Sequence, residues 1–205
     1  TLARVLTFRS YETETEVYNI SVDIPSIDMI SEDFTGLEEE INEEILELCE
    51  QYAAQAQKRA LDYREAFLAT GGTEEEWAAH NIEIKVWYEV MTQTEEYLSL
   101  VIEGSESWTS AYSRARYYNI DLEDGRLLSL RDVLGEDYKQ MADESIKAQM
   151  EERELNGISY FDDFNGISED QDFYLSDAGD PVIVFEPYEI APGSAGRQEF
   201  IIKGY

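Results

Sequence analysis

The strongest helical pattern in the sequence runs over residues 35–69. Thr35, followed three residues later by Glu38, predicts a capping box at its start, and Gly71 predicts its end. Large apolar side chains at helical spacing predict one buried stripe. That stripe consists of Leu37, Ile41, Ile45, Leu48 and Tyr52. At 1.5 Å per residue the helix would be about 50 Å long, so it is the longest element that the fold must accommodate.

Strand patterns lie on both sides of this helix. Residues 2–24 are rich in β-forming side chains, and Pro25 should end the second run or confine it to a sheet edge. Residues 82–122 contain three further runs, followed by a hairpin-turn signal at Glu123–Gly125. Consecutive strands of this kind form a meander, so we expect antiparallel pairing.

A second helix is predicted over residues 136–154, and the C-terminal stretch Phe173–Phe200 reads as two strands, a loop and a closing strand. The fold class is therefore α+β: antiparallel sheets with one long helix in the N-terminal half and a second helix packed on them. We expect an N-terminal region over residues 1–110 and a C-terminal region over residues 111–205 that pack as one unit.

The charge of the chain limits its partners. It contains 46 acidic and 15 basic residues, for a formal net charge of −31. Such a field repels nucleic-acid phosphates and anionic lipid headgroups, and it attracts cationic partners. The same charge also serves solubility, so by itself it does not identify a ligand.

The sequence does not predict an enzyme. Its only histidine is His80 and its only cysteine is Cys49, which excludes the usual zinc sites. His80, beside Trp77 on a short polar segment, is then the one histidine that could activate a nucleophile, and its setting does not favour that role. We expect no catalytic, metal or cofactor site, and we expect Cys49 to be a buried structural thiol beside the apolar stripe. No apolar run approaches the roughly 18 residues that span a bilayer, so any membrane attachment would use a segment absent from this chain.

One loop has the character of a binding site. Between Glu186 and Gly196, two prolines restrict the backbone while large side chains occupy a loop flanked by acids. The candidate partner-binding residues are Glu186, Pro187, Tyr188, Glu189, Ile190, Pro192 and Ser194. The sequence leaves two readings open. Tyr188 and Ile190 either face a partner or fill the end of the core.

The same C-terminal residues carry a family resemblance. The segment "FYLSDAGDPVIVFEPYEIAPGSAGRQEFII" resembles the C-terminal signature of the extracellular domain of RsiV-type anti-sigma factors, catalogued as domain-of-unknown-function family 3298. "YYNIDLEDGRLLSLRDVLGEDY" is also similar to it, and "YNISVDIPSI" with "GLEEEINEEI" is similar to its companion N-terminal region. Residues 53–80 match no part of that pattern.

The resemblance implies a noncatalytic α+β sensor or binding module outside the cytoplasmic membrane, in the bacterial cell envelope. The best-understood members of the family bind lysozyme, a cationic protein, and so release a sigma factor, whereas many members have no known role. Other members precede a polysaccharide deacetylase, so the alternative is a glycan- or peptidoglycan-binding accessory domain, with Trp77, Trp87 or Trp108 stacking on sugar. A structural envelope domain without a specific ligand is a third reading.

Overall fold

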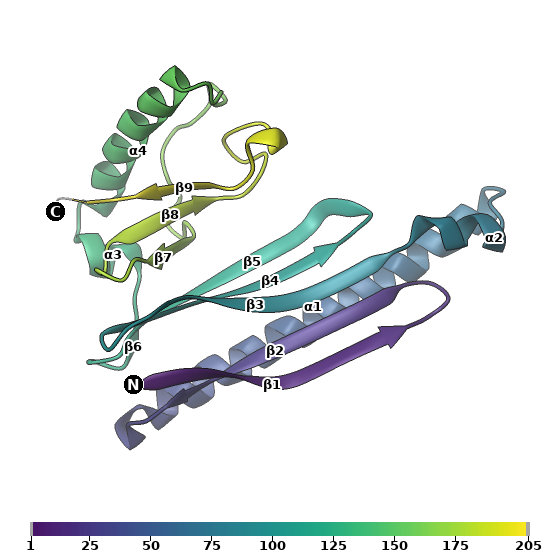
Figure 1. The fold of residues 1–205 in the computed structure, drawn as a ribbon, viewed down its shortest axis with the longest axis horizontal. Coiled ribbons are helices and arrows are strands. Elements are labelled where there is room, and N and C mark those ends of the chain that lie inside the picture. The colour runs from purple at the N-terminus through teal and green to yellow at the C-terminus, as the bar shows by residue number, and fades with distance from the viewer. Residues whose placement is uncertain (1, 204–205) are drawn as a thin grey trace. The chain divides into compact units, whose positions relative to one another are not determined.

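The computed structural model describes residues 2–203 and has an α+β architecture, as the sequence predicts (Figure 1). The chain divides into two compact units. Unit 1 contains residues 2–90 and 101–116, and unit 2 contains residues 91–100 and 117–203. The boundary expected at residue 110 stays a prediction.

The larger sheet contains six strands in the order β1-β2-β3-β4-β5-β6. Their bounds are β1 Ala3–Glu14, β2 Asn19–Met29, β3 Glu83–Gln93, β4 Tyr97–Glu106, β5 Thr109–Asp121 and β6 Arg126–Leu127. The first two strands form an antiparallel pair, but β2 and β3 are parallel, with Asn19–Val22 aligned to Glu83–Val86. This pair is an exception to the predicted antiparallel pairing. Parallel neighbours need a long crossover connection, and the helix between these strands supplies it.

Pro25 does not end its strand, because β2 continues to Met29. The proline lies beyond the segment that pairs with β3, and it aligns with Thr7 of β1 beside a register shift between Thr7 and Arg9. A proline cannot donate a ladder hydrogen bond, so it is accepted where the strand has a neighbour on one side only or beside a bulge. Pro25 therefore lies where β2 has no paired β3 residue, as an edge position requires, but the strand does not end there.

The long crossover is α1, Thr35–Ala69, with the bounds that the sequence predicts. Its predicted capping box is wrong. The hydroxyl of Thr35 donates to the carbonyl oxygen of Glu32 at 2.8 Å, and the Glu38 carboxylate accepts the backbone N–H of Met29 at 2.6 Å. The short helix η1, Glu32–Phe34, precedes α1, with Ser31 accepting the N–H of Asp33. The Glu38 carboxylate thus binds the backbone of β2 and does not cap the first turn of α1.

The buried side of α1 also differs from the predicted stripe. Its buried residues are Ile41, Ile45, Cys49, Ala53, Ala56 and Ala60. Leu48 is exposed, and Tyr52 lies half-buried over Gly104, where a Cβ atom would collide with its ring. The C-terminal half of the stripe is made of alanines, which allow the helix to approach the sheet closely.

The short helices α2, Glu74–Trp77, and η2, Ala78–His80, follow the end of α1. The predicted capping box of Thr73 and Glu76 is confirmed. Trp77 is buried, with its ring stacked on His80 at 4.6 Å between centroids. Trp108 stacks on Tyr63 of α1 at 4.7 Å. These rings pack on one another and close the end of unit 1.

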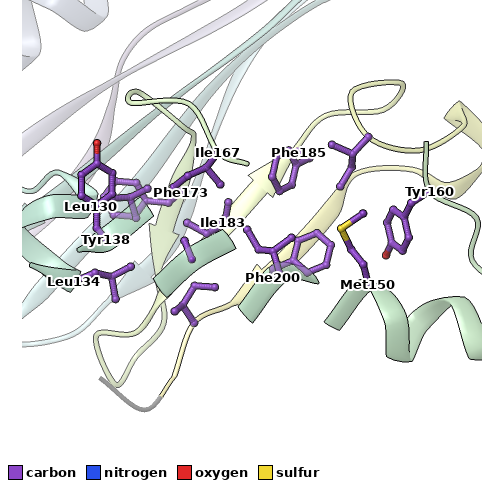
Figure 2. Close-up of a cluster of buried hydrophobic side chains, with 14 of the residues drawn as sticks. Leu130, Leu134, Tyr138, Met150, Tyr160, Ile167, Phe173, Ile183, Phe185 and Phe200 are labelled. Atoms are coloured by element: carbon purple, nitrogen blue, oxygen red, sulfur yellow. The ribbon is translucent and has the colours of Figure 1, made fainter. Parts of the chain in front are cut away.

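Unit 2 contains two helices, α3, Leu130–Leu134, and α4, Tyr138–Leu155, and a sheet in the order β7-β8-β9. The strands are β7 Phe173–Leu175, β8 Pro181–Phe185 and β9 Gln198–Ile201, all antiparallel. The predicted second helix is confirmed, and α3 is an additional turn capped by Ser129. Figure 2 shows the apolar side chains that fill the core of this unit, including Phe173, Ile183, Phe185 and Phe200.

A polar network crosses this apolar region and holds β7 to β4 and β5. The Ser99 hydroxyl donates to Oδ1 of Asn119 at 2.7 Å, and Nδ2 of Asn119 donates to the carbonyl oxygen of Phe173 at 2.8 Å. Ser99 also accepts the backbone N–H of Leu175 at 3.0 Å. Because Asn119 is only 4% exposed, water cannot replace these bonds when one partner is removed.

We expect Asn119→Ala to lower the free energy of unfolding by about 2 kcal/mol, because it leaves the buried Phe173 carbonyl without its side-chain donor and the buried Ser99 hydroxyl without an acceptor for its proton. Equilibrium unfolding in urea measures the change. Asn156→Ala is the matched control, since the Asn156 side chain is exposed and donates to the carbonyl of Glu152 at the end of α4. Its effect should be under about 0.5 kcal/mol. Equal losses in the two variants would contradict the role given to the buried network.

Cys49 is 1% exposed, and burial, with a smaller contribution from Glu50, raises the pKa of its thiol to about 12. The thiolate is the reactive form, so we expect no labelling of the folded protein by a maleimide or disulfide reagent at pH 8. The same reagent should label the protein completely in guanidinium chloride. Fast labelling without denaturant would show that the thiol is accessible.

Candidate functional site

The candidate site is the loop of residues 186–197, which joins β8 to β9 in unit 2. Every residue of β8 is buried, and Phe185 at its end lies in the core shown in Figure 2. The loop therefore starts from a fixed position. All seven candidate residues predicted from the sequence lie on it, at Glu186–Ile190, Pro192 and Ser194.

The first half of the loop is a tight turn. The N–H of Glu189 donates to the carbonyl oxygen of Glu186 at 3.1 Å, with Pro187 and Tyr188 between them. Tyr188 has φ of +71°. Because proline at the first central position has negative φ, a positive φ at the second identifies a type II turn. That position normally holds glycine or asparagine, so a tyrosine there is held against its own backbone preference.

Tyr188 points outward. Its side chain is 68% exposed, and its ring lies over Gly193, where an added Cβ atom would collide with it. Because Gly193 has no side chain, the ring can pack directly against the loop backbone at this position. The result is an aromatic group with a defined position and most of its surface open to solvent.

Ile190 points inward, two residues further on. Ile190 and Ala191 are both buried in the core of unit 2. The backbone N–H of Phe161 donates to the carbonyl oxygen of Ile190 at 2.8 Å, which fixes the loop at this point. The two readings left open by the sequence each hold for one residue. Ile190 fills the end of the core, and Tyr188 is available to a partner.

The second half of the loop is closed by local hydrogen bonds. The N–H of Ala195 donates to the carbonyl of Pro192 at 2.9 Å, and the N–H of Gly196 donates to that of Gly193 at 3.0 Å. They form the short helix η3, Gly193–Ala195. Pro192 and Ser194 are exposed here. This half of the loop therefore packs against the Tyr188 ring through Gly193 and exposes Pro192 and Ser194 to solvent.

An ion pair joins the two ends of the loop. Nε of Arg197 lies 3.2 Å from Oε2 of Glu186. The Glu189 carboxylate accepts the backbone N–H of Glu186 at 2.8 Å, which reinforces the turn from the other side. Both acids of the loop thus hold its shape. Arg197 and Gly193 were not among the residues predicted, although the arginine is a rare cation in an acidic chain and could have been noticed for that reason.

Elsewhere in residues 2–203 the histidine, cysteine and carboxylate side chains do not gather into a metal site. No group of three histidine, cysteine or carboxylate side chains in this range could hold a metal ion. Within the same residues, none of the helices combines the length and the apolar character that a membrane-spanning segment requires. Among the described residues, the loop of residues 186–197 is therefore the segment with the character of a binding site.

Residues 130–204, which include this loop, match the family described as "Protein of unknown function (DUF3298)". Over 210 residues the chain is 28% identical to "Anti-sigma-V factor RsiV" of Bacillus subtilis (strain 168). That alignment covers 98% of this chain and 68% of RsiV.

Two solved structures share the fold. A member of the DUF3298 family from Bacteroides fragilis superposes with a TM-score of 0.63, and a DUF3298 family protein from Pseudomonas aeruginosa PAO1 with 0.53. Each is 15% identical, covers 98% of this chain, and is itself covered to 90% and 89% respectively. The predicted resemblance is confirmed: residues 130–204 match the DUF3298 family, and the chain as a whole is similar to an RsiV anti-sigma factor.

Proposed function

We propose that this chain is the outward-facing, ligand-binding part of an RsiV-type anti-sigma factor. Its ligand is a cationic protein, with a lysozyme as the first candidate, and the segment Pro187–Ser194 enters the cleft of that partner. The domain acts by binding and not by catalysis. The observation that carries the proposal is Tyr188, an exposed aromatic residue held at positive φ on a braced loop.

A tyrosine in this position does little for the stability of the domain. Positive φ costs an L-residue on the order of 1 kcal/mol, and with 68% of its surface exposed the ring recovers little by burial. Backbone strain of this kind is typical of functional sites, where the surrounding structure holds a group in place. A rigid, exposed aromatic residue is also what the centre of a protein interface uses as an anchor.

The charge of the chain supports a cationic partner. A net charge of −31 creates a field that accelerates encounter with a basic protein, and salt weakens that field. The glycan-binding alternative finds less support. All three tryptophans lie within residues 2–203, and each is buried or half-buried, with Trp77 and Trp108 stacked on neighbouring rings.

The backbone strain at Tyr188 can be measured by comparing two variants that both lack the ring. We expect Tyr188→Gly to be more stable than Tyr188→Ala by about 1 kcal/mol, because only glycine adopts positive φ without a steric cost. Urea unfolding of the two purified variants measures the difference. If the alanine variant is equally stable or more stable, the turn is not strained in solution.

Binding is tested by calorimetry with a purified basic lysozyme at low and at physiological salt. We expect heat of binding with the wild-type chain and an affinity that falls as salt rises. Tyr188→Ala should weaken binding about 30-fold or more, as for a central anchor residue. Pro187→Ala should weaken it only a few-fold, by loosening the turn.

Two further variants sharpen this test. Gly193→Ala keeps the tyrosine but displaces its ring, since a Cβ at position 193 would occupy the same space, so we expect it also to weaken binding. Phe8→Ala is the control, because Phe8 is an exposed aromatic residue in unit 1, far from the loop in sequence. Absence of heat with the wild-type chain at low salt would refute lysozyme as the ligand. Unchanged binding by Tyr188→Ala would refute the role of the loop.

A further inference from the structure

A second exposed turn lies against the candidate loop. The backbone N–H of Phe161 donates to the carbonyl oxygen of Ile190 at 2.8 Å, so residue 161 is held beside the loop. The chain turns at Asp162 and Asp163 and returns to the core at Phe164, which packs edge-on against Phe185 at 5.8 Å between centroids. This segment, Phe161–Asp163, is here called the acidic turn.

Both sides of the acidic turn are anchored. Tyr160 is buried beside Phe200, as Figure 2 shows, and its hydroxyl donates to Oε1 of Gln198 at 2.8 Å. Phe164 packs against the core on the other side. The acidic turn and the loop are therefore both anchored in the core of unit 2. The distance between their exposed side chains should accordingly stay constant.

The exposed groups of the acidic turn have no structural task that accounts for them. Phe161 is 39% exposed, although the aromatic residues on either side, Tyr160 and Phe164, turn toward the core. Asp162 and Asp163 are exposed, and within residues 2–203 neither carboxylate forms an ion pair. By contrast, Glu186 and Glu189 of the loop are used in holding its shape.

We propose that Phe161, Asp162 and Asp163 form, together with the segment Pro187–Ser194, one continuous binding face for the same cationic protein. This inference rests on the function proposed above. The two aspartates supply carboxylates for lysine or arginine side chains at the rim of the partner, and Phe161 supplies apolar surface beside them. Arginine in particular pairs with carboxylates and also packs on aromatic rings.

The two kinds of residue should act on different rate constants. Charges at the rim of an interface mainly change the rate of association and its salt dependence, whereas packed groups mainly change the rate of dissociation. We expect Asp162→Asn/Asp163→Asn to slow association about 3- to 10-fold at low salt and to reduce the slope of affinity against salt. Phe161→Ala should raise the dissociation constant about tenfold, chiefly through faster dissociation.

The experiment is surface plasmon resonance of the whole chain against a purified basic lysozyme, with one matched control for each variant. Phe8→Ala removes an exposed phenylalanine elsewhere, and Glu39→Gln/Glu40→Gln removes the same two charges from the exposed side of α1. Both controls should bind with nearly wild-type rate constants. Hydrogen exchange of residues 186–191 shows whether Phe161→Ala leaves the loop ordered.

The outcomes separate this inference from the proposed function. Weaker binding by Phe161→Ala with unchanged exchange in the loop supports a direct contact, and weaker binding with faster exchange overturns it in favour of a positioning role. Wild-type kinetics in both acidic-turn variants, with binding still lost in Tyr188→Ala, overturns the inference and leaves the proposed function intact. If the wild-type chain does not bind, the proposed function fails and this inference fails with it.

Discussion

The burial of Ile190 and Ala191 in the core of unit 2 determines how the loop is displayed. These two side chains are fixed in the core, and so is the end of β8 at Phe185. Pro187 restricts the backbone between these two fixed points, so the connecting residues form a tight turn. The second central residue of that turn is Tyr188, which has to leave the core. Display of the aromatic ring therefore follows from apolar burial at the next residues, and the bonds of Glu186 with Arg197 and of Glu189 with the Glu186 N–H reinforce it.

The acidic residues of this region divide into two groups. Glu186 pairs with Arg197, and Glu189 accepts the backbone N–H of Glu186, so both hold the loop in shape. The exposed carboxylates of Asp162 and Asp163 carry no such bond among the described residues. In a chain with a net charge of −31, counting acids near a loop therefore overstates how many can meet a partner. Orientation and existing bonds decide which of them remain available.

Sequence reasoning succeeded where a local period was present and failed where geometry was set at long range. The bounds of α1 follow from helical spacing and from Gly71, but the loss of the Thr35–Glu38 box follows from a bond between Glu38 and Met29 of the preceding strand. The loop has no period, so the sequence could not assign Tyr188 outward and Ile190 inward. Pro187 is typical of the first central position of a type II turn, but the second central position usually holds glycine. Because Tyr188 occupies that second position, the sequence did not indicate the turn type.

Residues 53–80, which could not be placed in the family pattern from sequence, lie within the alignment to RsiV that covers 98% of the chain. They have a structural role in unit 1. They extend α1 so that Arg59 reaches Glu106 in a two-bond ion pair of 2.9 and 3.0 Å, with the carboxylate fully buried. One turn further on, Tyr63 stacks on Trp108, and Trp77 closes the same cluster. An unpaired Glu106 would be strongly unfavourable in that position, so the extension and the hairpin of β4 and β5 depend on each other. A segment that is committed to internal packing in this way stabilises unit 1, and it is not part of the binding face proposed for unit 2.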